Sequence, residues 1–148
     1  MESNRPGRIL ALDVGKKRIG LAISDQLGIT AQGLPTLLRT RIREDLEKLT
    51  AMARDNHAVS WLVGFPLHMS GEESRQAQWV REFGDRLAVH SGLPVVYWDE
   101  RLTSVEANRV LRSSGISLEK RAKAVDKLSA VLLLESHLEA RRNAWPEA

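Results

Sequence analysis

Carboxylates stand at the ends of two predicted strands and within a predicted helix, a distribution that can gather acids into one site. They are Asp13, directly before a glycine, the adjacent pair Asp99 and Glu100, and Asp126 inside an amphipathic segment. Sites in open α/β sheets form beyond the carboxyl ends of adjacent strands, so we expect these acids to converge. The chain has no cysteine, and no histidine stands among the acids. Oxygen ligands alone favour a hard divalent ion, so the pattern predicts a site for Mg²⁺ or Mn²⁺.

The chemistry expected of such a site is the hydrolysis of a phosphodiester. Two ions about 3.5 to 4 Å apart would activate a water molecule and stabilise the leaving oxygen. No covalent intermediate is needed, which agrees with the lack of cysteine and of a Ser-His-Asp order in the chain. The acids therefore predict a metal-dependent nuclease in which water is the nucleophile.

Basic residues flank each of the acids. In chain order they are Lys16, Lys17, Arg18, Arg101, Lys120, Arg121 and Lys123. Positions 101 to 127 contain 7 basic and 3 acidic residues, an excess that would attract a polyanionic backbone. Basic runs alone are usually solvated faces, and it is their proximity to the acids that favours a nucleic-acid partner.

The composition is that of an ordinary globular chain about one domain long. Its 148 residues carry a net charge of +3, and 43% of them are hydrophobic. This argues against global disorder, and the absence of cysteine excludes disulfides and thiolate metal sites. There is no apolar signal segment and no stretch near the ~18 apolar residues of a membrane span. We expect a cytoplasmic protein without a membrane partner, folded as one domain over 1–148 with frayed ends at about 1–6 and 143–148.

The first half of the chain has the pattern of a hairpin followed by a third strand. Residues 8–14 and 18–24 are apolar runs of strand length joined by a tight polar connection. A third run near 30–38 contains a glycine and a proline, which weaken it to an edge strand. Apolar residues at helical spacing then predict an amphipathic helix over 41–55.

Strands and helices alternate in the second half. Almost wholly apolar runs predict buried strands at 59–65 and 94–98. Capping boxes at Ser70 and Thr103 open helices that run to about 90 and 115, and a longer helix is expected from about 119 to 142. Three strands that can pair antiparallel precede βαβ units that demand parallel pairing. The order predicts an α/β fold with a mixed five-stranded sheet flanked by helices.

Four motifs in this chain are shared with a known family. They are LALDVGKKRIGLAISD, VGFPLHMSGEE, DERLTSVEA and KAVDKLSAVLLLESHLE, in this order. Through them the chain resembles the YqgF family, also called RuvX, over nearly its whole length. The resemblance implies a three-layer ribonuclease H-like fold and a metal-dependent nuclease that matures the 5′ end of pre-16S rRNA. An older family label, Holliday junction resolvase, supplies an alternative activity.

The resemblance also assigns the site acids motif by motif. They fall on Asp13, on the Asp-Glu-Arg turn with Glu100 as the favoured ligand, and on Asp126. Asp99 is the alternate ligand, because strand alternation places it and Glu100 on opposite sides and allows only one of them to bind directly. Sequence parity by itself does not choose between the two.

Two positions depart from the family's pattern. Lys127 stands where a small polar residue usually follows the helix acid, and His137 stands at a late aromatic position. Lys127 points about 100° around the helix from Asp126, so it need not occupy the metal site.

Other interpretations of the same residues remain open. Alone, Asp13 would be explained by turn chemistry and Asp126 by a solvated i to i+4 charge lattice. A nucleotide hydrolase or kinase also opens with a strand, an aspartate and a glycine turn, but such two-lobed enzymes need more than one domain. A non-catalytic RNA-binding ribosome assembly factor would keep the fold without efficient chemistry. Structured RNA is the expected partner, branched DNA the alternative, and an open sheet of this size is compatible with a homodimer.

Overall fold

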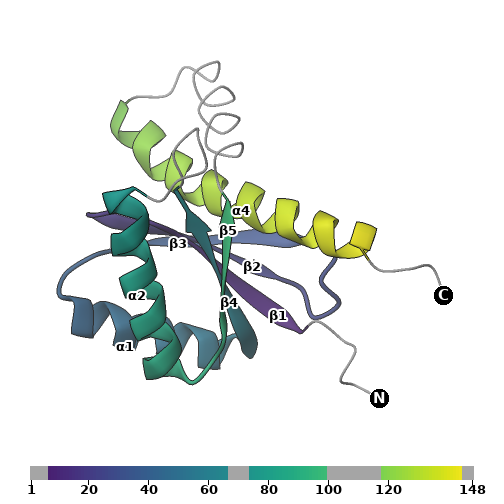
Figure 1. Ribbon diagram of the computed structural model, residues 1–148. Coiled ribbons are helices and arrows are strands. Elements are labelled where there is room, and N and C mark those ends of the chain that lie inside the picture. Colours follow the sequence, from purple (N-terminus) through teal and green to yellow (C-terminus); the bar gives the residue numbers. More distant parts are fainter. Residues whose placement is uncertain (1–6, 67–73, 100–117, 145–148) are drawn as a thin grey trace.

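Figure 1 shows the computed structural model, which describes residues 7–66, 74–99 and 118–144. In the last of these ranges, side chains are described from 128 to 142. The elements are β1 (Arg8–Val14), β2 (Arg18–Ser24), β3 (Ala31–Leu38), α1 (Ile42–Asp55), β4 (Ala58–Phe65), α2 (Arg75–Ser91), β5 (Val95–Asp99) and α4 (Leu118–Ala144).

The strands form one 5-stranded sheet in the order β3-β2-β1-β4-β5. β2 pairs antiparallel with both β1 and β3, whereas β4 runs parallel to both β1 and β5. The predicted mixed sheet is thereby confirmed. Because β1, β4 and β5 are parallel, they end at one edge of the sheet, which we call the C-terminal edge, and the β1–β2 turn lies at the same edge.

Helices cover both faces of this sheet, as a three-layer fold requires (Figure 1). On one face, α1 and α2 pack against a core that contains Leu10, Leu12 and Val14 of β1. On the other face, α4 packs against Ile9 and Ala11 of the same strand. We call these the α1/α2 face and the α4 face. Strict alternation along β1 thus divides its side chains between two separate cores.

The long helix α4 crosses the sheet with its carboxyl end over the β2–β3 connection. There Arg142 Nη1 donates a hydrogen bond to the carbonyl of Ile29 at 3.4 Å. This connection lies at the edge where β1 begins, since Leu10 of β1 is paired with Ile23 near the end of β2. The amino-terminal part of α4 therefore points toward the C-terminal edge, as Figure 1 shows.

The helix and strand boundaries agree closely with the sequence predictions in most places. The helix expected over 41–55 is α1, and the one expected from about 119 to 142 is α4. β5 includes Asp99 as its last residue. The helix expected between Thr103 and about 115 lies outside the described residues.

The start of α2 differs from its prediction. The helix begins at Arg75, and its N-cap is Ser74, whose hydroxyl accepts a hydrogen bond from the Ala77 N–H at 3.0 Å. The same hydroxyl donates to the Pro66 carbonyl at 3.2 Å, which ties the cap to the end of β4. The predicted start at Ser70 is wrong: the helix begins after Ser74, whose hydroxyl binds both a backbone donor and a carbonyl, and Ser70 itself lies outside the described residues.

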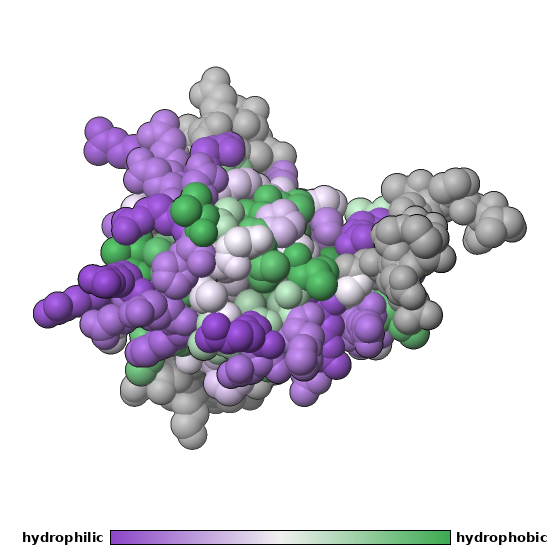
Figure 2. Space-filling model, turned by 90° about the horizontal axis from the view of Figure 1, so that it is seen from below, coloured by the Kyte–Doolittle hydropathy of each residue, from purple (hydrophilic) through white to green (hydrophobic). Residues whose placement is uncertain are grey.

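Large apolar side chains also reach the surface, from several elements and turns. They are Leu27, Ile29, Leu38, Val59, Val89 and Val96. Figure 2, which views the molecule from below Figure 1, shows hydrophobic residues in the middle of that face and hydrophilic residues around them. Within the described parts of the chain, no helix combines the length and the apolar character needed to cross a membrane.

Candidate active site at the C-terminal edge

Asp13 lies near the end of β1, on the α4 face of the sheet. Leu12 and Val14 belong to the core of the α1/α2 face, so alternation places Asp13 on the same side as Ala11. Asp13 is partly exposed, whereas Leu12 and Val14 are buried. In the register of the hairpin it stands opposite Gly20. The neighbouring strand therefore places no side chain directly across from this carboxylate.

Asp99 ends β5 at the same edge but belongs to the other face. β4 separates β5 from β1, which corresponds to roughly 10 Å between the two outer strands. Val95 and Tyr97 pack on the α1/α2 core, and Trp98 packs on the α4 core. Asp99 has the parity of Tyr97, so it lies on the α1/α2 face. The structure does not bring Asp99 and Asp13 together.

The remaining expected acids are only partly placed. Glu100 and Arg101 lie outside the described residues. Asp126 lies within α4, shortly before the first side chain of that helix that is described. The same stretch of helix contains Lys120, Arg121 and Lys123. Among the side chains that the structure does describe, there is no group of three or more acids or histidines that could hold a metal ion.

The β1–β2 turn presents cations beside Asp13. Lys16 and Lys17 are exposed, and Arg18 is half-buried at the start of β2. The turn is closed by the Gly15 N–H, which donates to the Arg18 carbonyl at 2.9 Å. A side chain at Gly15 would place its Cβ 2.7 Å from that carbonyl oxygen, so glycine is required for this close approach. Asp13 is therefore followed directly by a tight turn with two exposed lysines at this end of β1.

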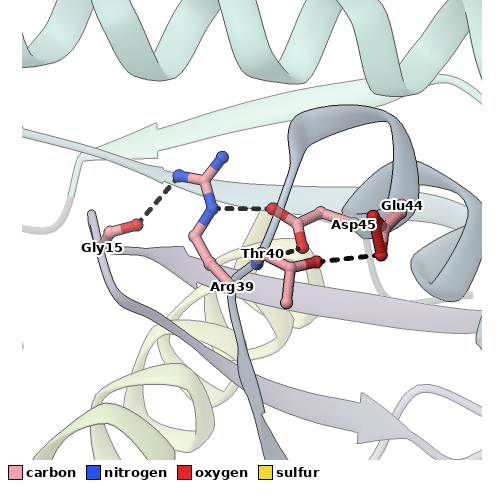
Figure 3. Close-up of polar contacts among 5 residues, drawn as sticks. All are labelled: Gly15, Arg39, Thr40, Glu44 and Asp45. Carbon is pink, nitrogen blue, oxygen red and sulfur yellow. Dashed lines mark hydrogen bonds and ion pairs between the residues drawn. The ribbon is translucent and has the colours of Figure 1, made fainter.

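A buried ion pair that is absent from the sequence predictions supports the turn. Arg39 Nε lies 3.1 Å from Asp45 Oδ2 of α1, and Arg39 Nη1 donates to the Gly15 carbonyl at 3.0 Å (Figure 3). The side chain of Arg39 is 10% exposed and that of Asp45 is 0% exposed. One signal was available in the sequence: Asp45 lies on the apolar stripe of α1 with Leu46 and Leu49. An acid at such a position needs a partner.

β5 and α4 meet through an aromatic contact near the C-terminal edge. Trp98 Nε1 donates to Ser136 Oγ at 3.3 Å, and the Trp98 ring meets His137 edge-on with centroids 4.8 Å apart. Burial lowers the pKa of His137, and the charge of Arg141 lowers it further. The His137 Nδ1 atom is buried and has no hydrogen-bond partner. These contacts attach the end of the last strand to the helix that contains the third expected acid.

Comparison with known proteins shows what this arrangement is similar to. The model of the RuvX family, described as Holliday junction resolvase, matches residues 7–140. A protein of Koribacter versatilis named "Putative pre-16S rRNA nuclease" is 56% identical over 135 residues, which cover 91% of this chain and 88% of that protein. A protein of the same name from Symbiobacterium thermophilum is 45% identical over 141 residues, which cover 95% and 98%.

Solved structures share the fold at low sequence identity. RuvC of T. thermophilus, in complex with a Holliday junction substrate, has a TM-score of 0.60 at 15% identity, over 93% of this chain and 97% of that one. The Fowlpox virus resolvase, in complex with Holliday junction DNA, has a TM-score of 0.52 at 12% identity, over 90% and 98%. Together with the strand order, these likenesses confirm the predicted ribonuclease H-like fold.

Proposed function

The chain belongs to the RuvX family, and on this premise we propose that it is a metal-dependent endonuclease that hydrolyses nucleic-acid phosphodiesters at the C-terminal edge of its sheet. The observation that carries the proposal is the position of Asp13. This acid stands near the end of the central strand, on the face covered by the helix that contains Asp126, and exposed lysines follow it in the turn. An acid beside cations at this edge can hold a metal ion next to a bound phosphate backbone.

We assign the catalytic acids to Asp13, Glu100 and Asp126. Helical periodicity places position 126 on the side of α4 that bears Ala130 and Leu133, both of which are buried in the core of the α4 face. The amino-terminal part of α4 points to the C-terminal edge. Position 126 precedes Ala130 in the helix, so it lies nearer the C-terminal edge than Ala130 does. This supports its inclusion in the site.

We assign the second acid to Glu100 in preference to Asp99. Asp99 lies on the α1/α2 face, away from Asp13. Glu100 lies outside the described residues, so its assignment rests on the family motif.

The proposed ligands suit Mg²⁺ or Mn²⁺. Carboxylate oxygens are the ligands that these hard ions prefer, and the chain contains no thiol that would favour a softer metal. Gly20 leaves the strand position opposite Asp13 without a side chain, so the neighbouring strand does not crowd a ligand there. When bound, a pair of such ions supplies an activated water and charge stabilisation for the leaving oxygen. The residues of the chain hold the ions and orient the phosphodiester.

Basic residues around the acids hold the nucleic-acid backbone. Lys16 and Lys17 are exposed in the turn, and Arg18 follows them. We assign the same role to Arg101, Lys120, Arg121 and Lys123. Contacts of this kind position a substrate without reading its sequence. Binding should weaken as salt is added, and removal of one such cation should reduce the slope of log affinity against log salt by about 1.

The proposed substrate is the precursor of 16S rRNA, cleaved near its 5′ end in the cytoplasm during ribosome biogenesis. The names of the relatives from Koribacter versatilis and Symbiobacterium thermophilum support this choice. A four-way DNA junction is the second candidate, because the family model is described as a Holliday junction resolvase.

A cleavage panel tests the proposal. Precursor rRNA, four-way DNA junctions and single strands are incubated with the protein in Mg²⁺ or Mn²⁺, and Asp13→Asn is compared with Asp99→Asn. The second variant is a matched control, because it makes the same substitution at the same edge but on the opposite face. We expect metal-dependent cleavage of precursor rRNA, a loss of about a hundredfold or more in Asp13→Asn, and activity close to wild type in Asp99→Asn.

Each other outcome of the panel has a defined meaning. Cleavage that survives Asp13→Asn would overturn the proposed mechanism. An equal loss in the two variants would identify Asp99, in place of Glu100, as a ligand. Preference for four-way junctions would select the second substrate. Salt-sensitive RNA binding without turnover, unaffected by loss of the acids, would show a non-catalytic assembly factor.

A further inference from the structure

Arg39 lies where three parts of the chain meet. Its guanidinium pairs with Asp45 of α1, donates to the Gly15 carbonyl of the β1–β2 turn, and lies over the rings of Trp79 and Phe83 of α2. The guanidinium carbon is 5.2 Å from the Trp79 centroid and 4.9 Å from the Phe83 centroid, close enough for cation–π attraction. Figure 3 shows the guanidinium between the turn and the first helix.

Stability alone does not explain this arrangement. Arg39 is nearly buried and Asp45 is fully buried, so the loss of hydration offsets much of the attraction between their charges. Apolar side chains of similar volume at the two positions can give similar stability. What only arginine supplies is a planar fork of donors that binds a carboxylate and a carbonyl at a fixed relative angle.

The carbonyl that this fork holds is two residues beyond Asp13. The Gly15 N–H donates a hydrogen bond to the Arg18 carbonyl, and the backbone N–H of Arg39 donates to the Lys17 carbonyl at 2.9 Å. The turn is thus tied both across itself and to the end of β3. Because the other partners of the guanidinium come from α1 and α2, Arg39 approaches the turn from the α1/α2 face, whereas Asp13 is on the α4 face. Arg39 must therefore act on the site through the backbone.

We propose that Arg39 is a positioning residue for the nuclease site. Through the Gly15 carbonyl it fixes the end of β1, so that Asp13 is already in place when a metal ion binds. This inference rests on the proposed function. Loss of the fork loosens the turn, which lowers the affinity for Mn²⁺ and the rate of cleavage. Groups that orient metal ligands from behind typically change affinity or rate by about 10- to 100-fold.

The test compares Arg39→Lys with Arg142→Lys. Lysine at position 39 keeps a positive charge near Asp45 but lacks the fork that also binds the Gly15 carbonyl. Arg142 is the matched control, because it too donates to a backbone carbonyl, that of Ile29, but at the opposite edge of the sheet. A double variant, Arg39→Met with Asp45→Leu, removes both charges and leaves neither one buried without its partner.

Each variant of the full chain is examined by three measurements. They are calorimetric binding of Mn²⁺ to the protein alone, amide hydrogen exchange in the β1–β2 turn, and kcat and KM for cleavage. For Arg39→Lys and the double variant we expect Mn²⁺ affinity and kcat to fall about 10- to 100-fold, with faster exchange in the turn and KM near the wild-type value. Arg142→Lys should match the wild type in all three.

The possible results separate a positioning role from a structural one. A lower unfolding midpoint with unchanged Mn²⁺ affinity and kcat in the folded protein would overturn the proposal, and so would unchanged exchange in the turn. A wild type that binds RNA without cleaving it would overturn the proposed function instead. In that case slower exchange in the wild-type turn than in Arg39→Lys would still establish that Arg39 holds Gly15, and equal exchange would exclude it.

Discussion

The two faces of the β1–β2 hairpin differ in the size of their side chains. On the α1/α2 face the cross-strand pairs are large and aliphatic: Leu10 with Ile23, Leu12 with Leu21, and Val14 with Ile19. On the α4 face the pairs are small: Ala11 with Ala22, and Asp13 with Gly20. α4 buries the small residues Ser129 and Ala130 in its first described turn, whereas its large buried residues, Leu133, Leu134 and Leu138, lie farther along the helix. The hairpin therefore carries large side chains along the α1/α2 face, whereas on the α4 face the side chains next to Asp13 are small and the large one, Ile9, lies at the start of β1.

This difference separates the part of the hairpin that stabilises the fold from the part that carries the acid. Each large aliphatic side chain buried on the α1/α2 face contributes about 1.5–3 kcal/mol. The small residues on the α4 face contribute less, but they let a helix approach the strands closely. The proposed site, with Asp13 on β1 and Asp126 on α4, requires such a close approach. The guanidinium of Arg39 lies on the α1/α2 face, so in its proposed role it acts on the site from the face opposite Asp13.

The largest expected effect on stability comes from removing a large side chain on the α1/α2 face. Leu12→Ala should lower the free energy of unfolding by about 2–5 kcal/mol, because Leu12 is 0% exposed in the core beneath α1 and α2. The kcat of the molecules that remain folded should change little, although Asp13 is the next residue. Urea unfolding measures the loss. Val89→Ala, at a side chain that is 86% exposed, is the control, and an equal loss there would contradict the comparison.

A smaller loss of stability with a larger loss of activity is expected when a small side chain on the α4 face is replaced by a large one. Ala22→Leu should lower the free energy of unfolding by about 1–3 kcal/mol, since Ala22 is 0% exposed and packed on the α4 core. The added volume should move α4 away from Asp13, so kcat should fall further than in Leu12→Ala. Ala22→Gly adds no volume and serves as the control. Full activity of folded Ala22→Leu would show that the spacing of α4 is not critical.

A still smaller change tests the space beside the acid. Gly20→Ala places a methyl group about 5 Å from the Asp13 Cβ on the same face. The free energy of unfolding should change by no more than about 1 kcal/mol, while Mn²⁺ binding should weaken. Gly33→Ala is the matched control, because Gly33 lies on β3, pairs with Ala22 of β2 and is separated from β1 by that strand. Weaker Mn²⁺ binding in both variants would point to a general disturbance of the sheet.

The smallest effect concerns His137 on the α4 face and depends on pH. Burial, with a further contribution from Arg141, holds the pKa of His137 below its ordinary value of about 6.5, so the unfolded chain takes up a proton first as the pH falls. The stability that a neutral His137 provides is therefore complete above pH 6.5 and is lost as the pH falls through the lowered pKa. His137→Phe keeps the ring contact with Trp98 and removes this loss. Urea unfolding at pH 5 and pH 8 measures the free energy of unfolding of the variant and of the wild type. The difference should favour the variant more at pH 5 than at pH 8, by less than about 1 kcal/mol because the site is half-exposed. An identical difference at both pH values would contradict this.

Local patterns in the sequence were sufficient for the strands, the turn and the order of elements. The hairpin follows from two apolar runs around a short polar connection, and α1 from apolar residues at helical spacing. These features depend on residues close together in the chain, so they can be read without the fold. The start of α2 shows the limit: the sequence predicted a cap at Ser70, whereas the cap that is used, Ser74, also donates a hydrogen bond to the Pro66 carbonyl after β4.

The sequence by itself determined that acids with bases beside them follow the strand ends, and it predicted the chemistry of a hard divalent metal for them. Only the tertiary structure decided that Asp13 and Asp99 lie on different faces. Alternation relates neighbours within a strand, but the relation between Asp13 and Asp99 depends on which helix packs against Ala11 and which against Tyr97. The same is true of Arg39, whose contacts with Asp45 and Gly15 exist only because β3, α1 and the turn converge in space. Side-chain chemistry is encoded locally, whereas the meeting of side chains on one face is produced by long-range packing.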